Sequence, residues 1–180
     1  LSWQAVGDQD DGQPQIFLLG VPRETVDGCV VGLQRAGVRL QAMDLKPLAL
    51  VRAANHADVI LADLEAQTVS VALVRGFVPY IVRSVALPGG AADAPGKRAE
   101  SLVAEIQRTL DFYDSTRAAE HAPWTPSVCL TGGLADQGQV REQVAEHWTI
   151  VDPTPPLPVP DDLPLAAYLA GVGLVLKRAT

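Results

Sequence analysis

The pattern of apolar and polar positions changes its period several times along this chain of 180 residues. Short runs rich in β-branched residues and bounded by turn residues predict strands, whereas apolar residues three and four positions apart predict helices. By this pattern we expect strands at residues 1–7, 15–21, 38–44, 58–64, 68–74, 78–87, 127–131 and 149–152. We expect helices at residues 23–36, 45–54, 97–114, 137–147 and 165–176.

Turn and loop residues separate these elements. We expect a polar turn at residues 8–14, a glycine- and proline-rich loop at 87–96, and a polar connection at 115–125. Six prolines within residues 153–164 exclude regular structure there. Gly37 directly follows the first predicted helix and is suited to cap its C-terminal end.

Two of the predicted helices differ in how their apolar residues are arranged. The helix at 97–114 carries a single apolar stripe, which predicts that one side packs against a core. The stripe consists of Leu102, Val103, Ile106, Leu110 and Tyr113. The helix at 165–176 is apolar on nearly all sides, which is typical of a helix buried all round.

From residue 58 onward the predicted order is strand, strand, strand, helix, strand, helix, strand, helix. Such an order predicts a mixed α/β sheet, in which an antiparallel meander is followed by strands joined through helical crossovers. It resembles the order of ribonuclease-H-like domains, from which each lobe of the actin-like ATPase fold is built. We therefore expect part of a small accessory α/β subdomain at 1–44, a linking helix at 45–57 and an actin-type lobe at 58–180.

Composition and charge narrow the possible functions. Hydrophobic residues make up 48% of the chain, which is enough for a substantial core. The net charge of −7 argues against a basic groove for nucleic acid. No apolar run reaches the roughly 18 to 20 residues that a membrane-spanning helix needs. The chain begins at Leu1 rather than at a methionine, and we expect further chain to precede it in the full protein.

Few residues point to catalysis or metal binding. Cys29 and Cys129 each lie in an apolar run, and we expect two reduced, buried thiols. We expect His56, His121 and His147 to lie at the surface. No Ser-His-Asp, Cys-His or paired-carboxylate arrangement is present, so we predict no catalytic residue and no metal cluster.

Four segments, in this order, resemble the PilM family of type IV pilus assembly proteins, which have an actin-like ATPase fold. They are GVRLQAMDLKPLALVRA (37–53), DVILADLEAQTVSVALVRGFVPYIVRSVALPGG (58–90), LVAEIQRTLDFYDS (102–115) and VCLTGGLAD (128–136). Residues 1–44 are similar to most of the accessory subdomain that this family shares with the cell-division protein FtsA.

The resemblance implies a place in an assembly platform. Members of the family lie on the cytoplasmic face of the inner membrane and bind the short tail of a PilN-like membrane protein. Similar proteins serve competence and type II secretion systems. The resemblance therefore implies a cytoplasmic scaffold that is peripheral to the inner membrane through its partner.

The resemblance also implies a nucleotide site, which this chain carries only in part. Asp63 would help to hold a metal-bound water, Thr68 would face phosphate, and Gly132 and Gly133 would approach the base or ribose. Glu65 stands where the family usually has glycine, and a carboxylate about 4 Å from an anion costs about 4 kcal/mol. Ordinary structure explains the other four equally well, as a hairpin turn at Asp63 and Thr68 and as a strand-to-helix turn at the glycines.

Two further departures bear on nucleotide binding. The family's first phosphate loop has no counterpart here, and residues 89–97 are too few for the subdomain that full members insert there. We therefore predict a scaffold that has lost nucleotide binding and has no bound cofactor. Two alternatives stay open: a partial ATP-binding member that uses magnesium, and a lobe of another protein in the superfamily, such as an FtsA-like filament protein or a small-molecule kinase. Exposed strand edges make an oligomer possible.

Overall fold

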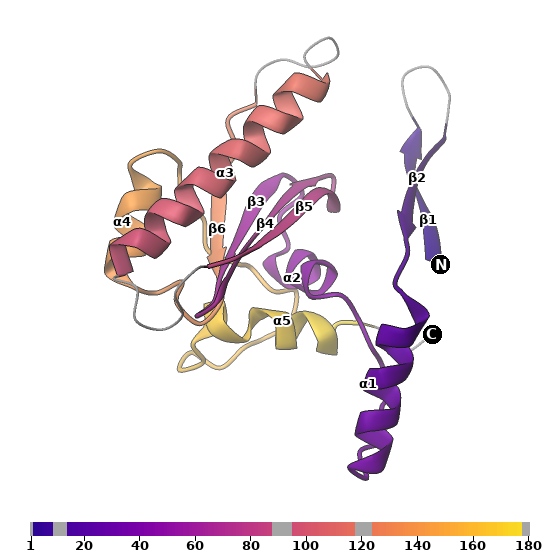
Figure 1. The fold of residues 1–180 in the computed structure, drawn as a ribbon. Helices are drawn as coiled ribbons and strands as arrows, with labels where there is room; N and C mark the ends of the chain where they lie inside the picture. The colour runs from indigo at the N-terminus through magenta and orange to yellow at the C-terminus, as the bar shows by residue number, and fades with distance from the viewer. Residues whose placement is uncertain (1, 9–13, 88–94, 118–123, 178–180) are drawn as a thin grey trace. The chain divides into compact units, whose positions relative to one another are not determined.

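The computed structural model describes residues 2–8, 14–87, 95–117 and 124–177, which fall into two compact units (Figure 1). The first unit lies within residues 1–43 and the second within residues 44–178. Three predicted loops lie wholly or largely outside the described residues. They are the turn at 8–14, the loop at 87–96, and the connection at 115–125, which includes His121.

The first unit consists of an antiparallel hairpin and a helix. Its elements are β1 (Ser2–Asp8), β2 (Pro14–Leu19) and α1 (Arg23–Arg35). Gly37 ends the helix as predicted: its φ is +74°, and its N–H donates to the carbonyl of Gln34 at 3.0 Å. The N–H of Val38 donates to the carbonyl of Leu33 at 2.9 Å. These two bonds form a Schellman motif, in which the left-handed position favours glycine.

The prediction of a strand at residues 38–44 is wrong. This segment has no regular structure, and Val38 is half exposed. A strand needs a neighbour for its backbone N–H and carbonyl groups. Among the described residues this segment pairs with neither strand of the two-stranded β1–β2 sheet, so its alternating sequence forms no ladder.

The second unit is built on a mixed sheet with the strand order β5-β4-β3-β6. Its strands are β3 (Val59–Leu64), β4 (Thr68–Arg75), β5 (Val78–Ala86) and β6 (Val128–Thr131). The first three form the predicted antiparallel meander, and β6 returns parallel to β3. The strand predicted at 149–152 is reduced to one parallel bridge between Ile150 and Val128, because Pro153 has no N–H with which to continue the ladder.

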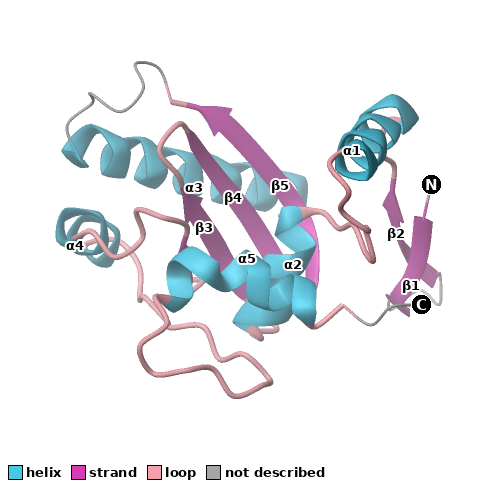
Figure 2. Ribbon diagram, turned by 90° about the horizontal axis from the view of Figure 1, so that it is seen from below, coloured by secondary structure: helices cyan, strands magenta, loops and turns pink. Residues whose placement is uncertain are grey.

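Helices cover both faces of this sheet (Figures 1 and 2). They are α2 (Lys46–Ala54), α3 (Pro95–Arg117), α4 (Gly138–Ala145) and α5 (Leu165–Val175). The alternation of side chains along β3 assigns the faces. Ile60, Ala62 and Leu64 pack with α3 and α4, whereas Val59 and Leu61 pack with α2 and α5. Because successive side chains of a strand point to opposite faces, Asp63 faces α2.

The apolar stripe predicted for α3 is confirmed. Four of its five residues are buried, and Val103 is partly buried against the same core. The stripe therefore supplies much of the layer that covers one face of the sheet.

The prediction that α5 is buried all round is wrong. Only Leu169 and Gly173 are buried, whereas Tyr168 and Val175 are 58% and 78% exposed. The helix lies on the sheet beside α2, and its outer side has no described neighbour that covers it. Uniformly apolar sequence cannot distinguish a half-buried helix from a fully buried one, since it carries no polar side to mark the exposed face.

The two cysteines differ in environment. Cys129 is buried within β6, and burial raises the pKa of its thiol to about 12. Cys29, on α1, is exposed, which corrects the prediction that both thiols are buried. The helix α1 has no buried residue at all, so an apolar run in its sequence does not bury the thiol.

The packing of α5 against α2 gives a test of the fold. A methyl group on Gly173 would overlap the backbone of Ala49, so we expect Gly173→Ala to lower the free energy of unfolding by about 2–4 kcal/mol. Gly171, on the open side of the same helix, is the matched control. Gly171→Ala should be neutral or stabilise by up to about 1 kcal/mol, because alanine has the higher helix propensity. Urea denaturation of both variants measures the difference, and equal effects would contradict the described crossing.

Candidate functional site

Asp63 lies at the centre of a row of polar residues that crosses the sheet. It sits opposite Thr131 of β6 on one side and Ser70 of β4 on the other, and Ser70 sits opposite Ser84 of β5. The Thr131 hydroxyl donates to Asp63 Oδ1 at 3.0 Å, and the hydroxyl oxygens of Ser70 and Ser84 are 2.8 Å apart. We call these four residues the polar row.

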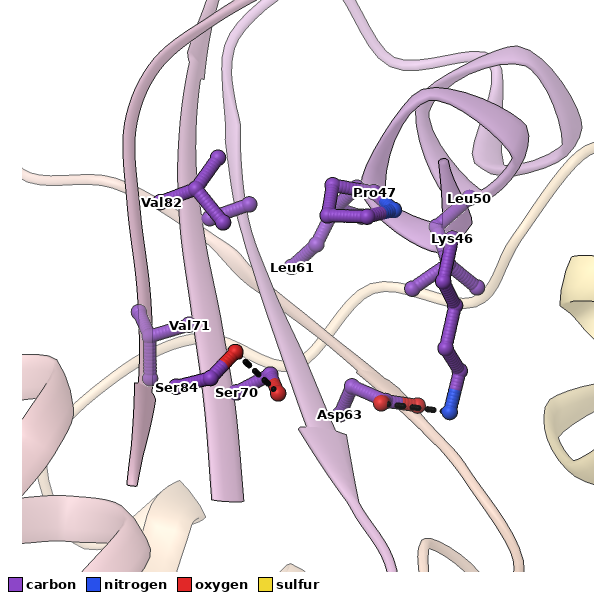
Figure 3. A pocket seen from close by; sticks show the side chains of 10 residues that line it. Lys46, Pro47, Leu50, Leu61, Asp63, Ser70, Val71, Val82 and Ser84 are labelled. Atoms are coloured by element: carbon purple, nitrogen blue, oxygen red, sulfur yellow. Dashed lines mark hydrogen bonds and ion pairs between the residues drawn. The ribbon is translucent and has the colours of Figure 1, made fainter. Parts of the chain in front are cut away.

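The carboxylate of Asp63 is neutralised by a lysine that sequence reasoning missed. Lys46 is the first residue of α2, and its Nζ lies 2.7 Å from Asp63 Oδ2 (Figure 3). The same Nζ lies 2.7 Å from Glu65 Oε1. Only 3% of the Asp63 side chain is exposed, so an unpaired charge there would be costly. The sequence carried part of the signal for this pair. The helix predicted at 45–54 begins near Lys46 and has to pack on one face of the sheet, and Asp63 points to one face because side chains alternate along a strand.

Glu65 ties the β3–β4 turn to the loop after β6. Its Oε1 pairs with Lys46, and its Oε2 accepts from the N–H of Gly133 at 3.3 Å. Its own N–H donates to the carbonyl of Thr68 at 2.9 Å, which closes the turn. Glu65 was predicted to bring a carboxylate toward a bound anion. In the structure this carboxylate has two partners within the chain, Lys46 and the Gly133 N–H.

Mutual attraction within this group shifts two pKa values. Burial alone would favour the neutral amine of Lys46, but the hydrogen bonds and charges of Asp63 and Glu65 outweigh it and raise the pKa of Lys46. Burial would likewise raise the pKa of Glu65, but Lys46 and the Gly133 N–H lower it. At neutral pH Lys46 is therefore positively charged and Glu65 negatively charged. We call Lys46, Asp63 and Glu65 the ion cluster.

The two glycines after β6 have different structural roles. Gly132 has a φ of +99°, and a Cβ atom there would overlap the backbone of Leu64, so the turn requires glycine. Its N–H donates to the carbonyl of Ala166 at 2.9 Å. Gly133 is exposed and approaches Glu65, whose Oε2 would lie 3.3 Å from an added Cβ. The strand-to-helix turn is sufficient to explain Gly132.

The predicted site residues are only partly brought together. Asp63, Glu65 and Gly133 meet around Lys46, and Gly132 lies beside them in the same loop. Thr68 lies at the exposed start of β4, where its carbonyl accepts the hydrogen bond that closes the turn.

A cavity of about 140 Å³ opens beside the ion cluster, between α2 and the strands β3, β4 and β5 (Figure 3). Pro47, Leu50, Leu61 and Val82 supply its apolar lining. Lys46 and Asp63 line it as well, together with the two serines of the polar row. Space, apolar surface and hydroxyl groups are therefore combined on one face of the sheet.

Within the described ranges, no cluster of three or more histidine, cysteine, aspartate or glutamate side chains is arranged to hold a metal ion. In the same residues, no helix combines the length and the apolar character needed to cross a lipid bilayer.

Comparison with solved structures identifies the class of fold. The PilM–PilN type IV pilus biogenesis complex matches over 97% of this chain and 65% of the matched chain, with a TM-score of 0.62 and 18% identity. The ethanolamine utilization protein EutJ from Carboxydothermus hydrogenoformans matches over 83% of this chain and 61% of its own, with a TM-score of 0.51 and 16% identity. A Bacteroides thetaiotaomicron protein with an actin-like ATPase fold matches over 98% and 58%, with a TM-score of 0.51 and 10% identity.

These matches show the fold alone, because the identities are low. The second unit has the predicted mixed α/β architecture, which is consistent with a lobe of an actin-like ATPase. Among these three structures, the PilM chain has the highest TM-score. The present chain spans less than two thirds of the length of each of the three. Neither models of known protein families nor curated proteins match it.

The ion cluster predicts a pH-dependent loss of stability when Lys46 is replaced. Lys46→Met leaves Asp63 buried without its cation, and at pH 7 we expect a loss of about 1–2 kcal/mol in unfolding free energy. This figure is smaller than for a fully buried pair, since 42% of the lysine side chain is exposed to water. The pKa of Glu65 is lowered in the folded chain, so the contribution of its carboxylate to the unfolding free energy is present above the ordinary pKa of 4.5. This contribution is lost as the pH falls through the lowered pKa of the folded state.

The difference between wild type and Lys46→Met should therefore shrink below pH 4.5. Urea denaturation at a series of pH values measures it. Lys46→Arg, which keeps the charge, should lose less than Lys46→Met, and Lys97→Met, at an exposed lysine of α3, should change little at any pH. Equal effects of Lys46→Met and Lys97→Met would show that the ion cluster does not stabilise the fold.

Proposed function

We propose that this chain is a cytoplasmic scaffold component of a type IV pilus assembly platform or a related competence or secretion system, whose actin-like lobe works without nucleotide. One observation carries the proposal: the ammonium of Lys46 lies between Asp63 and Glu65, at 2.7 Å from each carboxylate. By resemblance to PilM, Asp63 would otherwise help to hold a metal-bound water.

An internal ammonium competes with a magnesium ion for the same carboxylate. Both oxygens of Asp63 are engaged, one by Lys46 and the other by the Thr131 hydroxyl. A divalent ion about 4 Å from the ammonium would be repelled by about 8 kcal/mol at an effective dielectric of about 20, twice the value for unit charges. Magnesium bound near Asp63 therefore requires Lys46 to leave.

Phosphate is disfavoured by the same charges. Two carboxylates and one ammonium leave the ion cluster with a formal net charge of −1, and the side chains of Lys46 and Glu65 are both partly exposed. The N–H of Gly133, which is suited to contact an anion, donates to Glu65 instead. These contacts support a lobe that is complete without nucleotide.

The partner proposed for this scaffold follows from its structural similarity. PilM, the matched protein with a TM-score of 0.62, was solved in a complex with PilN. We propose that this chain likewise binds the tail of a PilN-like inner-membrane protein and is held at the cytoplasmic face of the membrane through that contact.

Isothermal titration calorimetry with Mg-ATP tests the loss of nucleotide binding. We expect no saturable heat up to about 1 mM nucleotide, because the ion cluster both fills the metal position and repels phosphate. Micromolar binding that Asp63→Asn abolishes would contradict this expectation and favour the alternative of an ATP-binding member. Gln67→Ala, at an exposed position of the same turn, serves as the matched control.

Fluorescence anisotropy with a labelled PilN-like tail peptide tests the partner. We expect saturable binding that a scrambled peptide does not reproduce. Addition of Mg-ATP should leave the binding unchanged, since the proposed function does not use nucleotide. Absence of binding by the intended tail, or equal binding by the scrambled peptide, would overturn the assignment to a pilus or secretion platform while leaving the calorimetric result intact.

A further inference from the structure

The strand β5 ends the sheet of the second unit and has only one strand neighbour among the described residues, β4. The backbone N–H and carbonyl groups on its other edge are therefore available for pairing with another strand. Such groups select their occupant by chemistry: only an extended polypeptide offers complementary donors and acceptors at the same repeat.

The second half of this edge lacks the usual protection against pairing. Natural edge strands are guarded by proline, lysine, bulges or short length. In β5 the features that hinder pairing lie near the start of the strand, where Pro79 is next to an irregularity in the β4–β5 register. Residues 81–86 contain no proline, glycine or lysine, and Val82 and Val85 are 46% and 38% exposed. Their one charge, Arg83, already pairs with Glu105 of α3 at 3.5 Å.

The face of the sheet next to this edge offers a place for a side chain. Leu61, Ala72 and Val82 form an apolar row across β3, β4 and β5, beside the polar row. The cavity between these strands and α2 lies over this apolar row (Figure 3). A strand added about 4.8 Å beyond β5 would extend both rows by one residue each. It would place an apolar side chain beside Val82 and a polar side chain beside Ser84.

We propose that residues 81–86 of β5 are a docking site for an extended segment of a partner protein, which adds a strand to the sheet and seats a bulky apolar side chain beside Val82 at the cavity. The docking site goes beyond the function proposed above, because the backbone of β5 makes the contacts whether or not nucleotide or a membrane-protein tail binds.

A separate protein fits this edge better than a second copy of the chain. Two copies paired antiparallel about Arg83 would set two arginines directly opposite each other and would place Val82 against Ser84 in both rows. Each copy also carries a net charge of −7, which opposes association between copies. The same acidic charge favours a segment that is neutral or basic.

Binding of short synthetic strands to the full chain tests the docking site. The probes are labelled peptides of about eight residues that alternate threonine and valine, carry a lysine at each end, and vary one central residue among valine, leucine and phenylalanine. A second set has the same sequences with N-methyl groups on alternate amides, which remove the backbone donors of one edge and keep the side chains. Fluorescence anisotropy measures the affinity of each peptide.

We expect the unmodified peptides to bind, the leucine and phenylalanine versions most tightly, and N-methylation to weaken binding by about tenfold or more. Val82→Lys should weaken binding by a similar factor, because a charge beside the cavity guards the edge. Phe112→Lys, at an exposed position of α3 away from the edge, is the matched control and should leave affinity unchanged.

Three results would overturn the proposal. The first is equal affinity of N-methylated and unmodified peptides, which would indicate apolar adhesion without strand pairing. The second is absence of binding by every peptide at about 1 mM. The third is a dimer in analytical ultracentrifugation that Val82→Lys dissolves and the peptides do not, which would assign the edge to self-association. The N-methyl comparison uses unaltered protein, so it stays decisive even where Val82→Lys disturbs folding.

Discussion

The contact on which the candidate site depends is the pairing of one ammonium with two carboxylates. Lys46 begins α2, Asp63 lies near the end of β3, and Glu65 lies in the turn that follows. A carboxylate as buried as that of Asp63 needs a cation or several hydrogen-bond donors. Here Lys46 and the Thr131 hydroxyl supply both requirements from within the chain. Helix α2 is thereby held at the end of the sheet where the strands β3 and β6 finish side by side.

The same pairing links fold to function. An actin-like lobe that bound Mg-ATP would leave polar groups at this end of the sheet to be satisfied by metal, water and phosphate. In this chain the polar groups at this end of the sheet bond to one another: Asp63 to Lys46, Glu65 to the Gly133 N–H, and Ser70 to Ser84. Hydrogen bonds satisfied internally remain in place without ligand, so the lobe keeps its shape in the absence of nucleotide. Internal contacts of this kind fit the scaffold proposed above better than an ATPase cycle, which requires contacts that change with the ligand.

Local patterns predicted the elements whose neighbours also lie close in sequence. The meander β3–β4–β5 follows from β-branched runs joined by tight turns, and the stripe of α3 follows from apolar residues such as Leu102 and Ile106 at helical spacing. Two of the failures depend on long-range neighbours. Residues 38–44 have a strand-like alternation without a partner strand, and Cys29 lies in an apolar run on a helix without a core. Lys46 was missed because its partners are 17 and 19 residues away in sequence (63 − 46 and 65 − 46) and meet it only when α2 packs on the sheet.

The pairing of polar groups elsewhere on the sheet also sets the unpaired backbone edge of β5 apart. Where the sheet faces α2, charges and hydroxyls are paired within the chain, and where it faces α3, Arg83 is paired with Glu105. Among the described strands of this sheet, β3 and β4 have strand neighbours on both edges, and β6 is followed by a bridge from Val128 to Ile150. The second half of β5 has neither a further strand nor a guarding residue on its outer edge. Among the described strands, its outer edge therefore has backbone hydrogen-bonding groups to offer, and a scaffold of the kind proposed would act through surfaces of this kind rather than through a reaction centre.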